Sequence, residues 1–290
     1  MKKIIFNTIL CSLLLAMTAC EQKNVPDNSN TGPKTKNFAN HRDSIVEQSF
    51  PMKHIIEEFT AIWCGYCPGG MSYIHDFVKN DTNWIVIMHH EDDDMSTRWD
   101  SVISNEFEIT SIPRTTINRA GLNMLFHPQE MGKWHCEDYE EETYVSLNVN
   151  NTYDSISRKL HIAVSGLVGQ SDFPNLRLTV LIKESGIIDK QGDMNVSTYH
   201  YWEEFCHTDV PRAYTTDALG DSIDVDNHGY FANDFELDMD STWVTNNCMV
   251  VAFVSEEIKP IIQVEQRPVV AGTMGGADIQ CGGITLGNKL

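Results

Sequence analysis

The chain has 290 residues and a formal net charge of −20, which argues against nucleic acid as a partner. Because a domain usually takes about 100 to 200 residues, we expect two domains. The sequence contains eight cysteines, some of which should pair if the chain is exported to an oxidising compartment.

The first twenty residues, MKKIIFNTILCSLLLAMTAC, predict an export signal. Lysines precede an apolar run that is too short to span a bilayer, and small residues follow it. The ending LLLAMTAC resembles a bacterial lipobox, which implies cleavage before Cys20, lipidation of its sulfur and anchoring in the membrane. The alternative is an ordinary secretory signal with Cys20 merely near the cleavage site.

The segment after the signal predicts a tether and then an α/β domain. Residues 21–50 are rich in Asn, Lys, Ser and Pro without an apolar period, which is typical of a flexible tether. The pattern then predicts a strand over 52–59, a helix over 64–79 and a buried strand over 83–90. This order favours a parallel βαβ unit.

The rest of the predicted α/β domain, which we place at residues 51–138, contains a helix and two strands. Apolar residues at helical spacing follow Ser96, a plausible cap. The segment SIPRTTINRAG, residues 111–121, is interpreted as two strands that meet at a turn.

The second half of the chain, residues 139–290, predicts an all-β domain. Apolar residues alternate at period two in three successive segments, and residues 248–269 have the pattern of a β-hairpin. The fold class that we expect is therefore an α/β domain followed by an antiparallel sandwich of immunoglobulin-like type.

The motif WCGYC brings Cys64 and Cys67 two residues apart, which is compatible with a redox centre, half of a zinc site or a structural staple. A zinc site needs further ligands, but the sequence has no second such pair, and His89 and His90 are neighbours on a predicted strand and point to opposite faces. A staple would close a very small ring and gain little stability. The redox interpretation is therefore favoured.

In the redox interpretation the two cysteines have different roles. Cys64 would stand at the start of a helix, whose backbone N–H groups lower the pKa of its thiol and make it the attacking group. Cys67, one turn further, would resolve the mixed disulfide. Trp63 and Tyr66 flank the pair and are interpreted as an apolar rim for a polypeptide substrate, or else as ordinary core residues.

The segments EFTAIWCGYC and ITSIPRTTINRAG together resemble the thioredoxin superfamily. The resemblance implies that Pro113, preceded by Ile112, is a cis proline that lies against the cysteines and shapes a substrate groove. It also implies that Glu58 is a buried acid that relays the proton of Cys67. The alternative for Glu58 is a solvated glutamate on a strand.

Taken whole, the chain resembles the Omp28-related outer membrane lipoproteins of Bacteroidetes, which join a thioredoxin-like domain to a β-rich one. The segment CHTDVPRAY, residues 206–214, resembles their HNHVLR signature, with His207, Val210 and Arg212 kept and Asp209 and Pro211 departing from it. Members of that family are described as surface proteins, some as adhesins or receptors. The resemblance implies a location in the cell envelope, at the outer membrane.

Three other patterns are given structural interpretations. HHEDDDM, residues 89–95, is read as a solvated loop that leads into a helix. DVDNHGYFANDF, residues 224–235, lacks the final glutamate of a calcium loop and is read as an Asx-rich turn. The remaining cysteines allow three pairings, and the sequence does not choose among them: Cys136, Cys206, Cys248 and Cys281.

The function that we expect is thiol–disulfide exchange on exported proteins, without a metal or a cofactor. The partners would be thiols or disulfides of those proteins, and the membrane through the lipid anchor. The alternative is a non-catalytic surface binding protein or adhesin that uses the thioredoxin fold as a scaffold. The sequence predicts neither the redox direction nor the oligomeric state.

Overall fold

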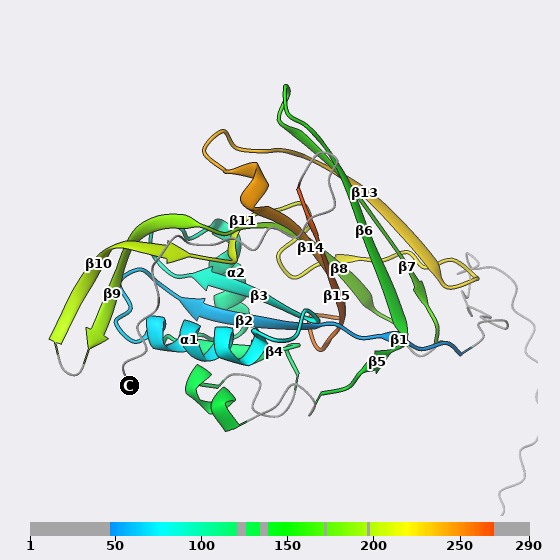
Figure 1. Ribbon diagram of the computed structural model, residues 1–290. Coiled ribbons are helices and arrows are strands. Elements are labelled where there is room, and N and C mark those ends of the chain that lie inside the picture. The colour runs from blue at the N-terminus through cyan, green and yellow to red at the C-terminus, as the bar shows by residue number, and fades with distance from the viewer. Residues whose placement is uncertain (1–46, 121–125, 134–138, 171–172, 196–197, 270–290) are drawn as a thin grey trace, which may run out of the picture. The chain divides into compact units, whose positions relative to one another are not determined.

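The computed structural model describes residues 47–120, 126–133, 139–170, 173–195 and 198–269. About half of these residues belong to β-strands, which form several separate sheets, and two α-helices lie in the first half (Figure 1). The first half contains the following elements: β1 (Phe50–Pro51), β2 (His54–Thr60), α1 (Cys67–Val78), β3 (Trp84–His90), α2 (Arg98–Glu106), β4 (Arg114–Ile117) and the 3₁₀ helix η1 (Pro128–Lys133).

Nearly all regular elements of the second half are strands. Its elements are β5 (Glu142–Thr143), β6 (Val145–Asp154), β7 (Lys159–Val168), β8 (Leu176–Glu184), β9 (Ile187–Asn195), β10 (Thr198–His207), β11 (Val210–Tyr214), β12 (Asp221–Ser222), β13 (Tyr230–Asp238), η3 (Thr245–Asn247), β14 (Cys248–Glu256) and β15 (Ile261–Pro268).

The predicted βαβ unit is present. Strands β2 and β3 are parallel and in register from His54 opposite Trp84 to Thr60 opposite His90, and α1 connects them. Strand β4 pairs with β2 in the antiparallel direction, which gives the strand order β3–β2–β4. The expected second strand in residues 111–121 is wrong, because Asn118 and Arg119 adopt φ angles of 51° and 49° directly after β4 and turn the chain away.

Side chains on β2 and β3 alternate between two buried faces of this small sheet. On one face, Ile56, Val86 and Met88 pack in a cluster with Met71 and Ile74 of α1. On the other face, Ile55, Phe59, Ile85 and Ile87 pack in a cluster with Ile103 of α2. Burial on both faces explains the nearly continuous apolar run in β3.

Helix α2 begins one residue later than its expected cap. Thr97, not Ser96, is the N-cap, and its hydroxyl and backbone N–H both donate to the Asp100 carboxylate. Ser96 instead donates its backbone N–H to Asp93 and accepts the Asp93 N–H on its hydroxyl. The HHEDDDM segment thus begins with the last two residues of β3 and continues as a hydrogen-bonded turn into α2, in which Asp92 and Asp94 are exposed as predicted but Met95 is buried.

Two antiparallel sheets of the second half enclose a common apolar core. One has the order β13–β7–β6 and the other the order β11–β8–β14–β15, with β12 beside β8. Strands β14 and β15 form the hairpin that the sequence predicts. The side chains between the sheets include Val149, Ile162, Val164, Val180 and Val250.

The sheet β8–β14–β15 is covered on both faces. Its other face, which includes Leu181, Val251, Phe253 and Val264, packs against the α2 side of β2 and β3 in one continuous core. The division at residue 139 stays a prediction, but the apolar core of the α/β part continues into the β part without a break.

Strands β9 and β10 form a two-stranded antiparallel arm outside these layers. Figure 1 shows the arm reaching past the beginning of α1. This arrangement brings residues from the far half of the chain to the loop that contains the cysteine motif.

Candidate functional site

The cysteine pair lies in the turn between β2 and α1. Cys64 and Cys67 form a disulfide, and their Cα atoms are 5.5 Å apart. Helix α1 begins at Cys67 with Tyr66 as its N-cap, so the prediction that it begins at Cys64 is wrong. Pro68 fits this start because the first turn of a helix tolerates a residue without an N–H. Cys67, not Cys64, is therefore the cysteine within the first turn of the helix.

Both cysteines are largely covered. Cys64 is 5% exposed and Cys67 is fully buried, and both pack with Ala61 and Ile112. Cys64 is thus the more accessible residue of the pair.

The segment before the proline lies beside the pair, as the thioredoxin resemblance implies. The Ile112–Pro113 peptide is cis, and Ile112 packs against the cysteines. Pro113 lies close to Gly70 in α1, since a β-carbon on Gly70 would be 3.3 Å from Pro113 Cβ.

Glu58 lies on the α1 face of β2 and is completely buried, which rules out the alternative of a solvated side chain. A β-carbon on Gly70 would be 2.5 Å from Glu58 Oε1, so the glycine leaves room for the carboxyl group. Neither carboxyl oxygen has a hydrogen-bond partner among the described residues. Burial therefore raises the pKa of Glu58 well above its usual value and favours the neutral form of the carboxyl group.

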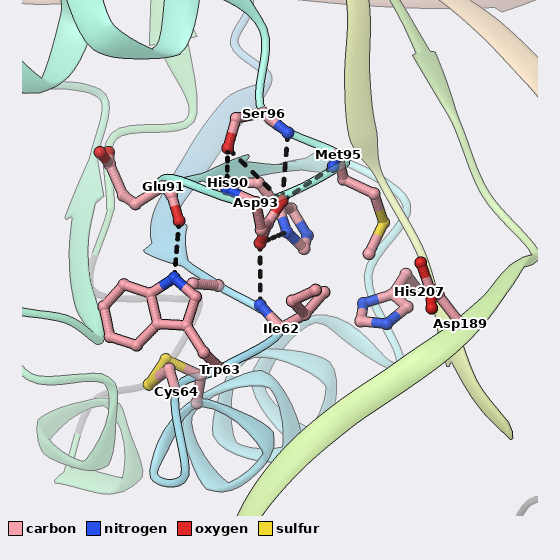
Figure 2. Close-up of polar contacts among 12 residues, drawn as sticks. Ile62, Trp63, Cys64, His90, Glu91, Asp93, Met95, Ser96, Asp189 and His207 are labelled. Carbon is pink, nitrogen blue, oxygen red and sulfur yellow. Dashed lines mark hydrogen bonds and ion pairs between the residues drawn. A yellow bond between two sulfur atoms is a disulfide. The ribbon is translucent and has the colours of Figure 1, made fainter. Parts of the chain in front are cut away.

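The two aromatic residues of the motif are exposed. Trp63 is 45% exposed and Tyr66 is 63% exposed, so they are not core residues. The Trp63 indole N–H donates to the carbonyl oxygen of Glu91 at 3.0 Å and fixes the ring beside the pair (Figure 2). This position fits the predicted rim.

The β9–β10 arm binds the motif loop, a contact that the sequence analysis did not predict. Backbone N–H groups of Gly192 and Met194 donate to the carbonyl oxygens of Ile62 and Gly65 at 2.6 and 2.7 Å. The arm therefore adds strand-like hydrogen bonds along one side of the motif.

Two side chains of the arm strengthen this contact. The Gln191 amide, fully buried, donates to the carbonyl oxygens of Ala61 and Cys64, each at 3.1 Å. The Tyr199 hydroxyl donates to the carbonyl oxygen of Trp63 at 2.9 Å. No local sequence signal links these residues to the motif, because Gln191 and Cys64 are 127 positions apart.

On the other side of the motif loop lies a buried group of polar residues around Asp93. The Asp93 carboxylate accepts the backbone N–H of Ile62 and a hydrogen bond from His90 Nδ1, both at 2.8 Å (Figure 2). Burial alone would raise the pKa of Asp93, but the hydrogen bonds from His90 and the backbone lower it. Asp93 thus ties the end of β3 to the residues directly before the cysteines.

A second buried polar cluster lies on the opposite face of β2. Glu57 accepts two hydrogen bonds from Arg119, at 2.6 and 2.7 Å, and His89 lies between Glu57 and Asp100. Burial alone would raise the pKa of Glu57, but Arg119 and His89 lower it to about 2. Burial would likewise lower the pKa of His89, but its two carboxylate partners raise it to about 9. This cluster connects β2, β3, α2 and the turn after β4, and it was not predicted from the sequence.

The CHTDVPRAY segment lies where the two halves meet. His207 and Val210 are buried, and the Arg212 guanidinium lies 3.3 Å from the Glu184 carboxylate. Asp209, one of the departures from the family signature, pairs with the buried Lys183 at 2.7 Å and accepts the Met88 N–H on its carbonyl oxygen.

The other cysteines are partly accounted for. Cys206 is disulfide-bonded, and Cys248 is buried as a free thiol whose pKa burial raises to about 12. Cys136, Cys281 and the predicted lipidation site Cys20 lie outside the described residues.

The described residues were predicted to contain no metal site, and residues 224–235 to form an Asx-rich turn. No group of three or more His, Cys, Asp or Glu residues in the described part of the chain could hold a metal ion. Asp226 accepts the backbone N–H groups of His228 and Tyr230, and Gly229 has a φ of 89°, so residues 224–235 contain the predicted Asx turn.

The family model of the outer membrane protein Omp28 matches residues 100–272. The chain belongs to the Omp28 family. Membership confirms the predicted location at the outer membrane. The matched range begins after the cysteine motif, so the family match by itself carries no argument about Cys64 and Cys67. None of the helices in the described ranges is long and apolar enough to cross a membrane.

Two solved structures are similar to this Omp28-family chain. HBP35 of Porphyromonas gingivalis is 20% identical, with a TM-score of 0.63 over 76% of each chain, which shows a shared fold. A domain of the outer membrane lipoprotein Omp28 from Porphyromonas gingivalis is 14% identical, with a TM-score of 0.30 over 43% of this chain and 86% of that one, too low to support an argument. No curated protein matches the chain.

Proposed function

We propose that this Omp28-family protein exchanges disulfides with exported proteins through Cys64 and Cys67, on a thioredoxin-like domain at residues 51–138. The observation that carries the proposal is the Glu58 carboxyl, which is buried beside the first turns of α1 without a hydrogen-bond partner among the described residues. A purely structural strand gains nothing from such a group, because burying an unpaired carboxyl costs free energy. A carboxyl group that exchanges a proton with a buried thiol, by contrast, has to be buried in this way.

The oxidised pair can react in two steps. A substrate thiolate attacks the Cys64 sulfur, the Cys64–Cys67 bond breaks, and Cys67 leaves as a thiolate that takes a proton from Glu58. A second substrate thiolate then attacks the substrate sulfur of the mixed disulfide, and Cys64 leaves. The substrate loses two electrons and gains a disulfide, while the pair becomes a dithiol. The reverse sequence reduces a substrate disulfide.

The residues around the pair supply a place for the substrate chain. Trp63 and Tyr66 offer exposed aromatic surface, and Ile112, which precedes Pro113, packs against the two cysteines. In this proposal an extended segment of an exported protein lies along Ile112 and Pro113 and packs against the aromatic rings. A lipid on Cys20 and the tether over residues 21–50 hold the domain near the membrane, and the β domain at 139–290 orients the partner.

A second candidate function is binding without chemistry. Apart from the motif aromatics, the arm itself exposes Tyr199, Tyr201 and Trp202 by 41, 42 and 46%. Exposed aromatic residues of this kind are enriched at protein interfaces. An adhesin would use this surface and leave the disulfide closed.

Trapping of mixed disulfides distinguishes the two functions. In the full chain with Cys67→Ser, Cys64 can form a mixed disulfide that nothing resolves. We expect this variant to accumulate covalent complexes with exported proteins, which disappear on reduction, whereas Cys64→Ser forms none. Equal and low amounts of complex in both variants would contradict exchange and favour the adhesin.

A further inference from the structure

Two buried histidines face each other next to the motif loop. His90 ends β3 and His207 ends β10, and their ring centroids are 5.5 Å apart with an interplanar angle of 67°. Both residues are only 1% exposed. The pair therefore joins the α/β part to the base of the arm in a place that water does not reach freely.

The hydrogen bonds of each ring define which nitrogen carries the proton. His90 Nδ1 donates to the Asp93 carboxylate, so in the neutral ring the lone pair is on Nε2. His207 Nε2 donates to the carbonyl oxygen of Lys190 at 3.3 Å, because a carbonyl can only accept, and this leaves a lone pair on Nδ1.

These two remaining nitrogens have no partner. Neither His90 Nε2 nor His207 Nδ1 makes a hydrogen bond within the described residues. Two buried lone pairs without a partner cost free energy, which a proton donor or a cation between them would offset.

The Met95 side chain brings a thioether sulfur to the same region. Met95 is 4% exposed and packs with Ile62 and Val210, and its backbone N–H donates to Asp93. Figure 2 shows the Met95 side chain extending toward His207 on the side where His90 lies. One carboxylate, Asp93, thus holds both the His90 ring and the turn that carries Met95.

We propose that His90 Nε2, His207 Nδ1 and the Met95 sulfur bind a copper(I) ion. This site is independent of the chemistry proposed for Cys64 and Cys67, although Asp93 also holds the loop before that pair.

The spacing of the two rings fits one shared ion. A metal–imidazole nitrogen bond is about 2.0–2.1 Å long, so two imidazoles on one ion have centroids about 5 to 6 Å apart. The hydrogen bond from His90 to Asp93 is the carboxylate contact that commonly orients a metal-binding histidine.

The donor set favours copper(I) over a divalent ion. Thioether sulfur is a soft ligand that selects copper(I), whereas zinc normally takes four nitrogen, thiolate or carboxylate ligands. The described residues offer no third His, Cys, Asp or Glu to complete such a set. A single positive charge is also balanced by the Asp93 carboxylate behind His90.

The test is an anaerobic copper(I) titration of the full chain in detergent, with the Cys64–Cys67 disulfide kept oxidised and bicinchoninate as the competing chelator. The His90→Gln/His207→Gln double variant measures how much copper(I) binds elsewhere on the chain, and this amount is subtracted. We expect wild type to bind one more copper ion than this double variant, and X-ray absorption to show nitrogen and sulfur neighbours. His161→Gln is the matched histidine control, because the His161 side chain is 50% exposed on β7.

Met95→Leu tests the site without deleting a buried polar group. We expect this variant to bind copper(I) about tenfold or more weakly, because one of three ligands is lost. Met88→Leu, an equally buried methionine in the α1-facing core, should bind as wild type does. The proposal is overturned if wild type and the double variant bind the same amount of copper, if Met95→Leu binds as tightly as wild type, or if zinc displaces copper(I) from these residues.

Discussion

Glu57 and Glu58 are neighbours in sequence with opposite environments, because successive residues on a strand face opposite sides of the sheet. Glu57 meets Arg119 and His89, and its pKa falls to about 2, whereas the pKa of the unpaired Glu58 rises well above its usual value. Glu57 is thus held charged by its partners, whereas burial favours the neutral form of Glu58, which its proposed role as a proton carrier requires. Substitutions at Glu58 and at the Arg119 partner of Glu57 test these two environments separately.

Glu58→Gln should change the pH dependence of stability. The unfolded chain releases the Glu58 proton above pH about 4.5, while the folded chain keeps it, so the contribution of Glu58 to folding is complete below that pH and is lost as pH rises. Urea unfolding at pH 5 and pH 8 should therefore show the variant gaining stability relative to wild type at the higher pH, by at most about 1.4 kcal/mol per pH unit. Glu106→Gln, an exposed control at the end of α2, should show no such gain. A difference between Glu58→Gln and wild type that does not vary with pH would contradict a protonated Glu58.

Arg119→Met should destabilise the fold by about 3 to 5 kcal/mol, because it leaves the buried Glu57 charge without its main partner. Denaturant unfolding near pH 7 measures this loss. Arg98→Met removes an exposed arginine and should change stability by no more than about 0.5 kcal/mol. Similar small effects of both substitutions would show that the Glu57–Arg119 pair is not needed.

At the scale of elements, helix α1 supports the site through two glycines with different surroundings. A β-carbon on Gly69 would meet no atom within 4 Å, whereas one on Gly70 would lie 2.5 Å from Glu58 Oε1 and 3.0 Å from Pro128 Cγ. Only Gly70 is thus required by packing, although both glycines cost helix stability.

The substitutions Gly69→Ala and Gly70→Ala should therefore have opposite effects. Gly69→Ala should stabilise the protein by about 0.5 to 1 kcal/mol through helix propensity. Gly70→Ala should destabilise it by about 1 to 3 kcal/mol, because the methyl group overpacks against the Glu58 carboxyl. Thermal and denaturant unfolding measure both, and an equal gain in the two variants would mean that the carboxyl does not lie behind Gly70.

Elements defined by neighbouring residues were predicted from the sequence, whereas contacts between distant segments were not. The strand–helix–strand unit, the β14–β15 hairpin and the cis bond before Pro113 were predicted, because they follow from local periodicity or from a motif. The β9–β10 arm and the Glu57–Arg119 pair were missed, because their contacts join residues far apart: 127 positions between Gln191 and Cys64, and 62 between Arg119 and Glu57. A pattern of polar and apolar residues does not contain such pairings.

At the scale of the whole molecule, one core connects the α/β part to the β part. The fully buried Phe253 on β14 packs in the same cluster as Phe59 and Ile87 of the small sheet, and Arg119 lies 5.1 Å from its ring. Because neither part can separate without exposing this cluster, the two parts should be stable only together.

The expected result is a single cooperative unfolding transition for both parts. Phe253→Ala should lower stability by about 3 to 5 kcal/mol. Hydrogen exchange should show that β2–β3 and β6–β7 lose protection by the same amount. Tyr230→Ala, at an exposed position on β13, is the control. Loss of protection in the β part alone would contradict a shared core.

The reduction potential of the Cys64–Cys67 couple decides whether this pair exchanges disulfides or only closes a loop. It is measured on the full chain in glutathione buffers, with the thiols counted by mass tagging. For a pair that exchanges disulfides we expect a reversible couple between about −270 and −120 mV, the range from thioredoxin to strong oxidants of the periplasm. A pair that stays closed below about −300 mV would identify a structural disulfide and contradict thiol–disulfide exchange.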